Sequence, residues 1–130
     1  IVKNNNILGK GNNSVPKGVN PCTEKTCIRK VLKLKSGERQ ELCRVVHAEQ
    51  NAIISVARKD CIGATLYMVG KDVKTGDYVE KSMPCAMCKR TIINSGIEKV
   101  IIRDNKEEYR EIDVQEFIDN DESLEGSMGY

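Results

Sequence analysis

Two short segments, residues 47–49 (His-Ala-Glu) and 84–88 (Pro-Cys-Ala-Met-Cys), constrain the fold of this chain more than any other feature. A proline favours the start of a helix, and Cys85 and Cys88, three residues apart, then lie on one face of the first turn. His47 likewise begins a run of apolar residues with helical spacing. The sequence therefore predicts two helix N-termini that face each other and bring one imidazole, two thiols and one carboxylate together.

This set of side chains is typical of a catalytic zinc site. Zinc takes four ligands, and catalytic sites usually take three from the protein and leave the fourth position to water. We expect His47, Cys85 and Cys88 to be the metal ligands, and Glu49 to be the catalytic residue that moves protons beside the metal. The alternative, a closed structural zinc site, needs a fourth Cys or His ligand and gives Glu49 no role.

The two segments read H-x-E and P-C-x-x-C, which is the signature of the zinc-dependent nucleobase deaminases. The chain also resembles the deoxycytidylate (dCMP) deaminase family over roughly residues 1–118. Three further stretches carry this resemblance: Gly11-Asn12-Asn13-Ser14-Val15-Pro16-Lys17-Gly18, Cys22 with Cys27-Ile28-Arg29, and the run from Cys43 through His47 to Ile53. It implies an α/β fold, a three-layer α/β/α sandwich with a mixed sheet, and Zn²⁺-dependent hydrolytic deamination of dCMP.

The resemblance also implies roles for residues outside the zinc ligands. Asn13 would contact the pyrimidine and sugar of the nucleotide, and the Ala48 carbonyl would hold the amino group. Without the resemblance, Asn13 is a turn residue in a loop. Arg58 would lie near the phosphate or a subunit contact, and its alternative is a solvated helix end. The family forms homo-oligomers, hexamers in several members, and the resemblance implies regulation by dCTP and dTTP.

Three further cysteines, Cys22, Cys27 and Cys43, have two interpretations. Free cysteines are commonly buried and behave as small apolar side chains. The resemblance favours a second, structural zinc, because some dCMP deaminases carry such a ligand near Cys22, although three cysteines leave the fourth ligand unidentified. Cys61 stands alone in the sequence, and we expect it in the core.

Two features depart from the family pattern. Family members usually carry a helix before the first strand, and this sequence, which we expect to form a single deaminase domain over residues 1–130, shows none. The stretch from Lys71 to Met83 is also longer than the usual link between strand and P-C-x-x-C motif. We therefore expect the loop beside the active-site mouth to differ from the family pattern.

The composition suits one globular domain that binds a small molecule. The 21 basic and 19 acidic side chains nearly cancel, which gives no electrostatic footprint for duplex nucleic acid. No apolar run approaches the roughly 18 residues of a membrane span. No signal peptide is visible, so the six cysteines favour metal ligands or free thiols in a reducing cytoplasm over disulfides.

Apolar periodicity and turn residues predict the order of the elements. We expect a β-hairpin over 1–3 and 7–9, a loop over 9–21, a weak helix over 26–35, the central helix over 41–59, strands at 65–69 and 78–80, a helix over 85–94 that ends before Gly96, a strand at 99–103 and a helix at 114–118. Such alternation implies a sheet covered on both faces. The tail from about residue 119 is polar and is expected to be loose.

Two alternatives to dCMP deamination are open at this point. The signature alone also permits a deaminase of cytosine, guanine or tRNA adenosine. The near-neutral charge and the long insertion between Asn13 and His47 disfavour tRNA. The second alternative is a catalytically silent zinc-binding protein, which the intact Glu49 disfavours.

Overall fold

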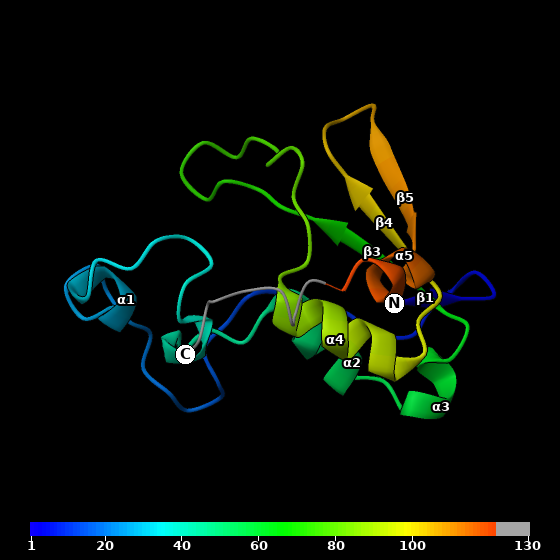
Figure 1. Ribbon diagram of the computed structural model, residues 1–130, viewed down its shortest axis with the longest axis horizontal. Coiled ribbons are helices and arrows are strands. Elements are labelled where there is room, and N and C mark those ends of the chain that lie inside the picture. Colours follow the sequence, from blue (N-terminus) through cyan, green and yellow to red (C-terminus); the bar gives the residue numbers. More distant parts are fainter. Residues whose placement is uncertain (122–130) are drawn as a thin grey trace.

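The computed structural model describes residues 1–121, which form a five-stranded sheet with helices packed against it (Figure 1). The strands lie in the order β2-β1-β3-β4-β5. β3 and β4 are parallel, whereas the other neighbouring strands are antiparallel. The strands are β1 Val2–Lys3, β2 Asn6–Ile7, β3 Thr65–Val69, β4 Lys99–Arg103 and β5 Tyr109–Asp113. The predicted mixed sheet of an α/β fold is confirmed.

The predicted N-terminal hairpin follows from its asparagines. Val2 pairs with Ile7 across the hairpin, and the turn residues Asn4 and Asn5 have φ of 50° and 61°. Asparagine tolerates this left-handed region better than most residues, and two such residues in succession match the twist of a tight hairpin. The hairpin places β1 beside β3 and β2 at the edge of the sheet.

The helices predicted over 26–35 and 41–59 are shorter in the structure, whereas those over 85–94 and 114–118 form nearly as predicted. They are α1 Ile28–Val31, the 3-10 turn η1 Gln40–Leu42, α2 Ala48–Ile54, α3 Arg58–Cys61, α4 Ala86–Ser95 and α5 Val114–Asp119. The helix predicted to end before Gly96 does so: Gly96 has φ of 84°, and an added Cβ would lie 2.8 Å from the Ile62 side chain. Glycine is the residue that adopts this left-handed cap without steric cost.

The central helix predicted over residues 41–59 is wrong in its bounds. Residues 43–47 are extended instead, because the amide and carbonyl of Val46 bond to the backbone of Ser14 at 2.8 and 3.1 Å. His47 then caps α2, and the Gln50 side chain accepts a hydrogen bond from the His47 amide at 3.2 Å. This contact between segments far apart in the sequence overrides local helix propensity.

Strand β5 was not predicted, and the strand predicted at 78–80 is reduced to one bridge between Tyr78 and Lys71. The sequence of β5, Tyr-Arg-Glu-Ile-Asp, carries three charged residues and only one side chain that is buried in the core, Ile112. It lies at the edge of the sheet, where one face meets solvent and a continuous apolar run is not required.

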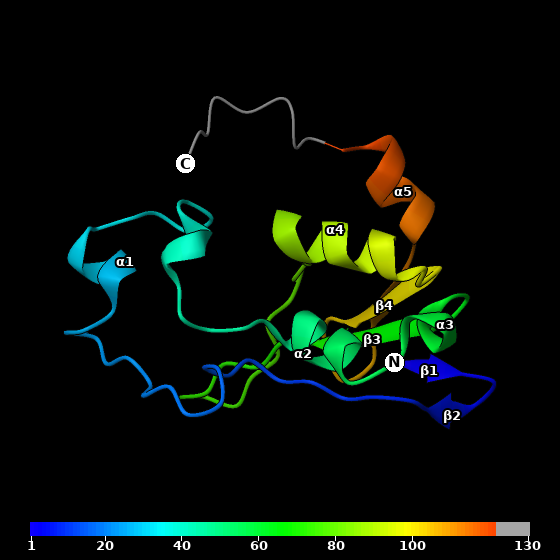
Figure 2. The same ribbon diagram turned by 90° about the horizontal axis from the view of Figure 1, so that it is seen from below.

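One hydrophobic core lies between the sheet and helices α2, α4 and α5 (Figure 2). The sheet and the helices contribute fully or nearly buried side chains, among them Leu66, Val100, Ile102, Ala52, Ile92 and Phe117. On the other face of the sheet, the side chains of Tyr67 and Tyr109 are 57% and 60% exposed. Within residues 1–121 the helices therefore cover one face only, and the second helical layer of the predicted sandwich is not formed by these residues.

The described part of the chain has no helix with the length and apolar character that crossing a membrane requires. All six cysteines are free thiols. Cys61 is fully buried in the core, as predicted. Helix α5 ends at Asp119, and the remainder of the predicted polar tail, residues 122–130, lies outside the described residues.

Candidate active site

His47, Cys85 and Cys88 converge on one point. The Nδ1 atom of His47 lies 3.4 Å from Cys85 Sγ and 3.3 Å from Cys88 Sγ. A tetrahedral zinc ion, with bonds of about 2.0 Å to nitrogen and 2.3 Å to sulfur, holds such atoms about 3.5 Å apart. Within residues 1–121 no other group of three His, Cys, Asp or Glu side chains brings its ligand atoms so close. The residues therefore fit zinc, as the sequence predicted.

The two helices supply these ligands from their N-termini. His47 is the N-cap of α2 and Cys85 the N-cap of α4, while Cys88 is the third residue of α4. The two helices pack side by side (Figure 1). The positive end of a helix stabilises a thiolate, so the start of α4 favours the ionised form of its cysteines.

The thiols of Cys85 and Cys88 differ in acidity. Contact with the Cys88 thiol lowers the pKa of the Cys85 thiol to about 5, and the charge of the His47 imidazole is a smaller cause. The same contact raises the pKa of the Cys88 thiol, as do burial and the Glu49 carboxylate. The pair thus ionises first at Cys85, and a metal that binds both sulfurs must displace the proton of Cys88.

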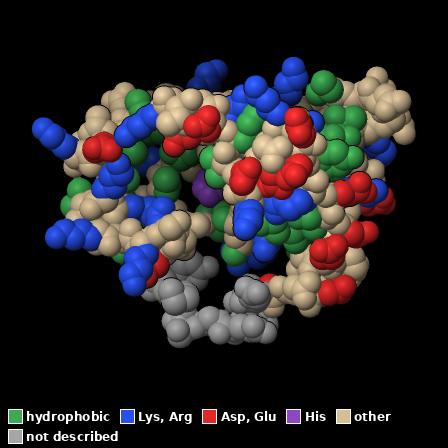
Figure 3. All heavy atoms as spheres, turned by 90° about the horizontal axis from the view of Figure 1, so that it is seen from above, with side chains coloured by type: hydrophobic (Ala, Val, Ile, Leu, Met, Phe, Trp, Pro, Cys, Tyr) green, Lys and Arg blue, Asp and Glu red, His purple; other side chains and the backbone are tan. Residues whose placement is uncertain are grey.

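Glu49 lies in the first turn of α2, beside Cys88 but outside the group of ligand atoms. A cavity of about 290 Å³ opens next to it, and its lining includes Gly11, Ala48, Glu49 and Met68. Figure 3 shows the chain's single histidine, in purple, in a hollow of the surface. Of the predicted site residues, Ala48 and Glu49 line this cavity, whereas the three zinc ligands do not.

The loop that leads into the insertion, residues 14–46, packs closely against α2. The side-chain oxygen of Asn13 accepts a hydrogen bond from the Ala48 amide at 2.8 Å, and the contact of Asn13 with the nucleotide stays a prediction. The Asn51 side chain donates to the Asn12 carbonyl at 2.8 Å and to Ser14 Oγ at 3.2 Å. A Cβ on Gly11 would lie 2.3 Å from the Ala48 carbonyl oxygen. The close approach of loop to helix therefore requires glycine at this position.

Sequence reasoning missed Asn51 and Gln50. Gln50 has a recognisable signal, because a Glu or Gln three residues after the N-cap completes a capping box. Asn51 has no such signal, since its partners lie 37 and 39 residues away in the sequence.

Arg58 lies away from the metal ligands of its own chain. Its Nε donates to the Asn94 carbonyl at 3.0 Å, near the C-terminus of α4. Cys85 is at the other end of that helix, which at 1.5 Å per residue is roughly 13 Å away along the axis. The guanidinium thus ties α3 to α4, and a role near the phosphate or in a subunit contact stays a prediction.

Cys22, Cys27 and Cys43 are not gathered into a group of three ligands within the described residues. All three lie in the insertion, residues 14–46, which also contains α1 and η1. Cys22 and Cys27 interact, and the pKa of the Cys27 thiol is lowered, first by the backbone amide of Lys30 and, to a smaller extent, by Cys22. The proposed second zinc stays a prediction.

The comparison with known proteins decides the family. Residues 1–103 match the family model described as the cytidine and deoxycytidylate deaminase zinc-binding region. The chain belongs to this family. The matched residues include all three candidate zinc ligands and Glu49.

Two relatives carry a more specific name. A protein named deoxycytidylate deaminase from Mycobacterium phage D29 is 35% identical over 108 residues, which cover 78% of this chain and 72% of the relative. A protein of the same name from Schizosaccharomyces pombe is 28% identical over 101 residues, which cover 78% of this chain and 28% of the relative. No solved structure matches this deaminase chain at a significant level.

Proposed function

We propose that this protein is a zinc-dependent hydrolase that deaminates dCMP to dUMP with release of ammonia. One observation carries the chemistry: the His47, Cys85 and Cys88 ligand atoms converge on one point, and Glu49, beside Cys88, lines a cavity. The names of the two relatives, both deoxycytidylate deaminases, support the substrate.

The residues of the site divide the work of the reaction. Zinc, when bound, supplies Lewis-acid activation of water near neutral pH. Glu49 takes a proton from the attacking water and passes it to N3 of the cytosine ring while the oxygen adds to C4. Glu49 then takes the remaining proton of that oxygen, which becomes the C4 carbonyl, and gives it to the departing amino group, so that ammonia leaves. Ala48 and Asn13, which are joined by a hydrogen bond, would orient the base.

The charge of the insertion supports a substrate with a phosphate. Residues 14–46 carry eight basic and three acidic side chains, in a chain whose total charge is close to neutral. Lys and Arg side chains gather on the bulge beside the hollow that contains His47 (Figure 3). Such a field attracts an anionic nucleotide more strongly than a neutral base such as cytosine or guanine.

The substrate is tested by measuring ammonia release from dCMP, deoxycytidine, cytosine, guanine and tRNA on one enzyme preparation. We expect dCMP to have the highest kcat/KM, because it alone combines the cytosine ring with one 5′-phosphate. Faster turnover of a free base or of tRNA adenosine would reject the proposed substrate. No ammonia from any of the five would favour the silent zinc-binding protein.

Three finer features are proposed from the family resemblance: a second zinc at Cys22, Cys27 and Cys43, a homo-oligomer larger than a dimer, and regulation by dCTP and dTTP. A cytoplasmic location is proposed from the cysteines. The free state of all six cysteines supports a reducing compartment. The positive charge of residues 14–46 supports binding of anionic nucleotides as regulators.

Metal content tests the two zinc sites separately. We expect at least one zinc per chain in the wild type, and about two if the second site exists. Cys22→Ser should then lower the zinc content by one equivalent and reduce stability while sparing turnover, because Cys22 lies in the insertion and outside the catalytic ligand group. Wild-type protein with one zinc, and a Cys22→Ser variant with the same content, would reject the second site.

A further inference from the structure

The loop between β3 and α4, residues 70–85, decides where the ligand Cys85 enters the site. Its outer part is a self-contained turn, in which the Asp72 carboxylate accepts hydrogen bonds from the amides of Lys74 and Thr75 at 2.8 and 3.0 Å. Every residue from Lys71 to Thr75 is exposed. This part of the loop has no core packing that could fix the position of the chain before Cys85.

The inner part of the loop is anchored by one ion pair from the β4–β5 hairpin. Arg110 donates to both carboxylate oxygens of Asp104, at 2.6 Å from Nε and 2.9 Å from Nη2. The same Nη2 donates to the Ser82 carbonyl at 2.6 Å. The Lys81 amide donates to the Asp104 carboxylate at 2.7 Å. Two successive loop residues are thus bonded to the two members of one pair.

Three observations indicate that this anchor is a specific feature of the fold. The Asp104 side chain is 12% exposed and the Arg110 side chain 33%, so the pair is largely shielded from water. Arg110 also keeps the pKa of the Asp104 carboxyl low, chiefly through their hydrogen bond. Lys81 has φ of 57°, in the left-handed region that non-glycine residues adopt only at an energetic cost. The hydrogen bond from the Lys81 amide to the Asp104 carboxylate stabilises that conformation.

The anchor acts on one zinc ligand more than on the others. Cys88 is fully buried within α4, and His47 is held by α2. Cys85 is the N-cap, so its position depends on the residues that precede the helix. Only Met83 and the buried Pro84 separate the anchored Ser82 from Cys85. A displacement at Ser82 is therefore passed on to the Cys85 thiol through a short and restricted stretch of chain.

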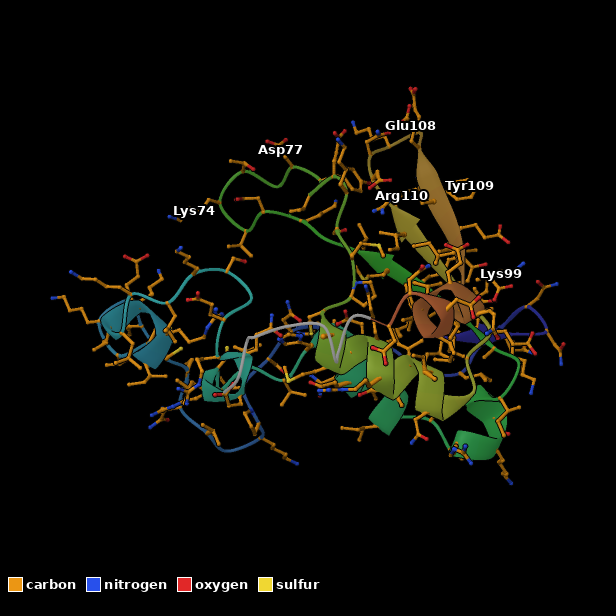
Figure 4. All side chains as sticks on the ribbon, in the orientation of Figure 1. Lys74, Asp77, Lys99, Glu108, Tyr109 and Arg110 are labelled. Carbon is orange, nitrogen blue, oxygen red and sulfur yellow. The ribbon has the colours of Figure 1, made fainter. Side chains whose placement is uncertain are left out.

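We propose that the Asp104–Arg110 pair positions Cys85 for zinc, which makes Asp104 and Arg110 positioning residues of the deaminase site. Figure 4 shows Arg110 on the side of the hairpin that faces the loop. The proposal rests on the zinc site alone and not on the identity of the nucleotide. Its failure is therefore distinguishable from failure of the proposed substrate.

Arg110→Lys tests the pair, because lysine keeps the charge but cannot bond both carboxylate oxygens and the Ser82 carbonyl with one planar group. We expect its zinc affinity, measured by competition with a chelator in the folded protein, to fall roughly 10- to 100-fold, the range typical when a group that supports a metal ligand is removed. Turnover at saturating zinc should fall less.

Glu111→Gln is the matched control. It breaks the ion pair of 2.6 Å between Lys99 and Glu111, two half-exposed side chains on the same two strands. Lys99 lies on the side of the hairpin away from the loop (Figure 4). We expect the zinc affinity of this variant to stay within about twofold of the wild type, since exposed ion pairs contribute little. A fall equal to that of Arg110→Lys would mean that any damage to the hairpin weakens the site, and would overturn the proposal.

Two further measurements distinguish the proposed positioning role from a purely structural role of the pair. A purely structural role predicts a lower melting temperature for Arg110→Lys with zinc affinity unchanged in the folded protein, and this result would overturn the proposal. If Arg110→Lys does not fold, Asp104→Asn carries the same test. Hydrogen exchange on zinc-free wild type needs no variant: the Lys81 amide should be protected, because the anchor must exist before zinc binds. Rapid exchange there would also reject the proposal.

Discussion

Replacement of Glu49 by glutamine is expected to abolish most of the turnover and to leave the zinc content unchanged. Glutamine is nearly isosteric with glutamate, and Glu49 lies outside the group of ligand atoms, so both metal and fold should persist. General acid–base transfer is worth typically about 10²- to 10⁴-fold in rate. Because Glu49 serves more than one proton step, we expect a loss near or above the upper end of that range.

Zinc content, dCMP binding and ammonia release should be measured on one preparation of Glu49→Gln. Glu107→Gln, an exposed carboxylate on the β4–β5 turn, is a suitable control and should retain full activity. Loss of zinc together with activity would indicate that Glu49 is a metal ligand. Turnover near the wild-type rate would show that another group carries the protons and would refute the mechanism proposed for this site.

The candidate zinc site could be predicted because each of its halves is encoded locally. The histidine and the glutamate lie two residues apart, the two cysteines three apart, and each segment begins a helix. Strands 65–69 and 99–103 were also predicted with the observed bounds, since both are runs of residues that favour strands. Such signals need no knowledge of the rest of the fold.

Features that depend on distant partners could not be predicted in this way. The extended stretch before His47 is set by pairing with Ser14, more than 30 residues earlier in the chain. The anchor joins Arg110 to Ser82, which are 28 residues apart, and no local pattern marks either residue. The exposed face of the sheet mixes tyrosines with charged side chains, so its strand β5 resembles a loop in sequence.

The two fully buried cysteines allow the metal role of a thiol to be separated from its packing role. Cys88 and Cys61 are both 0% exposed, but only Cys88 lies beside His47. Cys88→Ala should lose zinc and turnover, because removal of a ligand costs more affinity than the roughly 10- to 100-fold typical of outer-shell changes. Cys61→Ala should retain both and lose about 1–2 kcal/mol of unfolding free energy, the usual scale of a small core deletion.

These two variants are best compared by metal analysis, ammonia release and denaturant unfolding under one set of conditions. Each change removes one thiol sulfur from a fully buried position, so the two variants lose the same packing. The difference in their zinc content therefore reports ligation alone. Retention of zinc by Cys88→Ala would show that the ligand set is wrong. Loss of zinc from Cys61→Ala, in protein that is still folded, would place the metal elsewhere and remove the structural basis for Glu49 as the proton carrier.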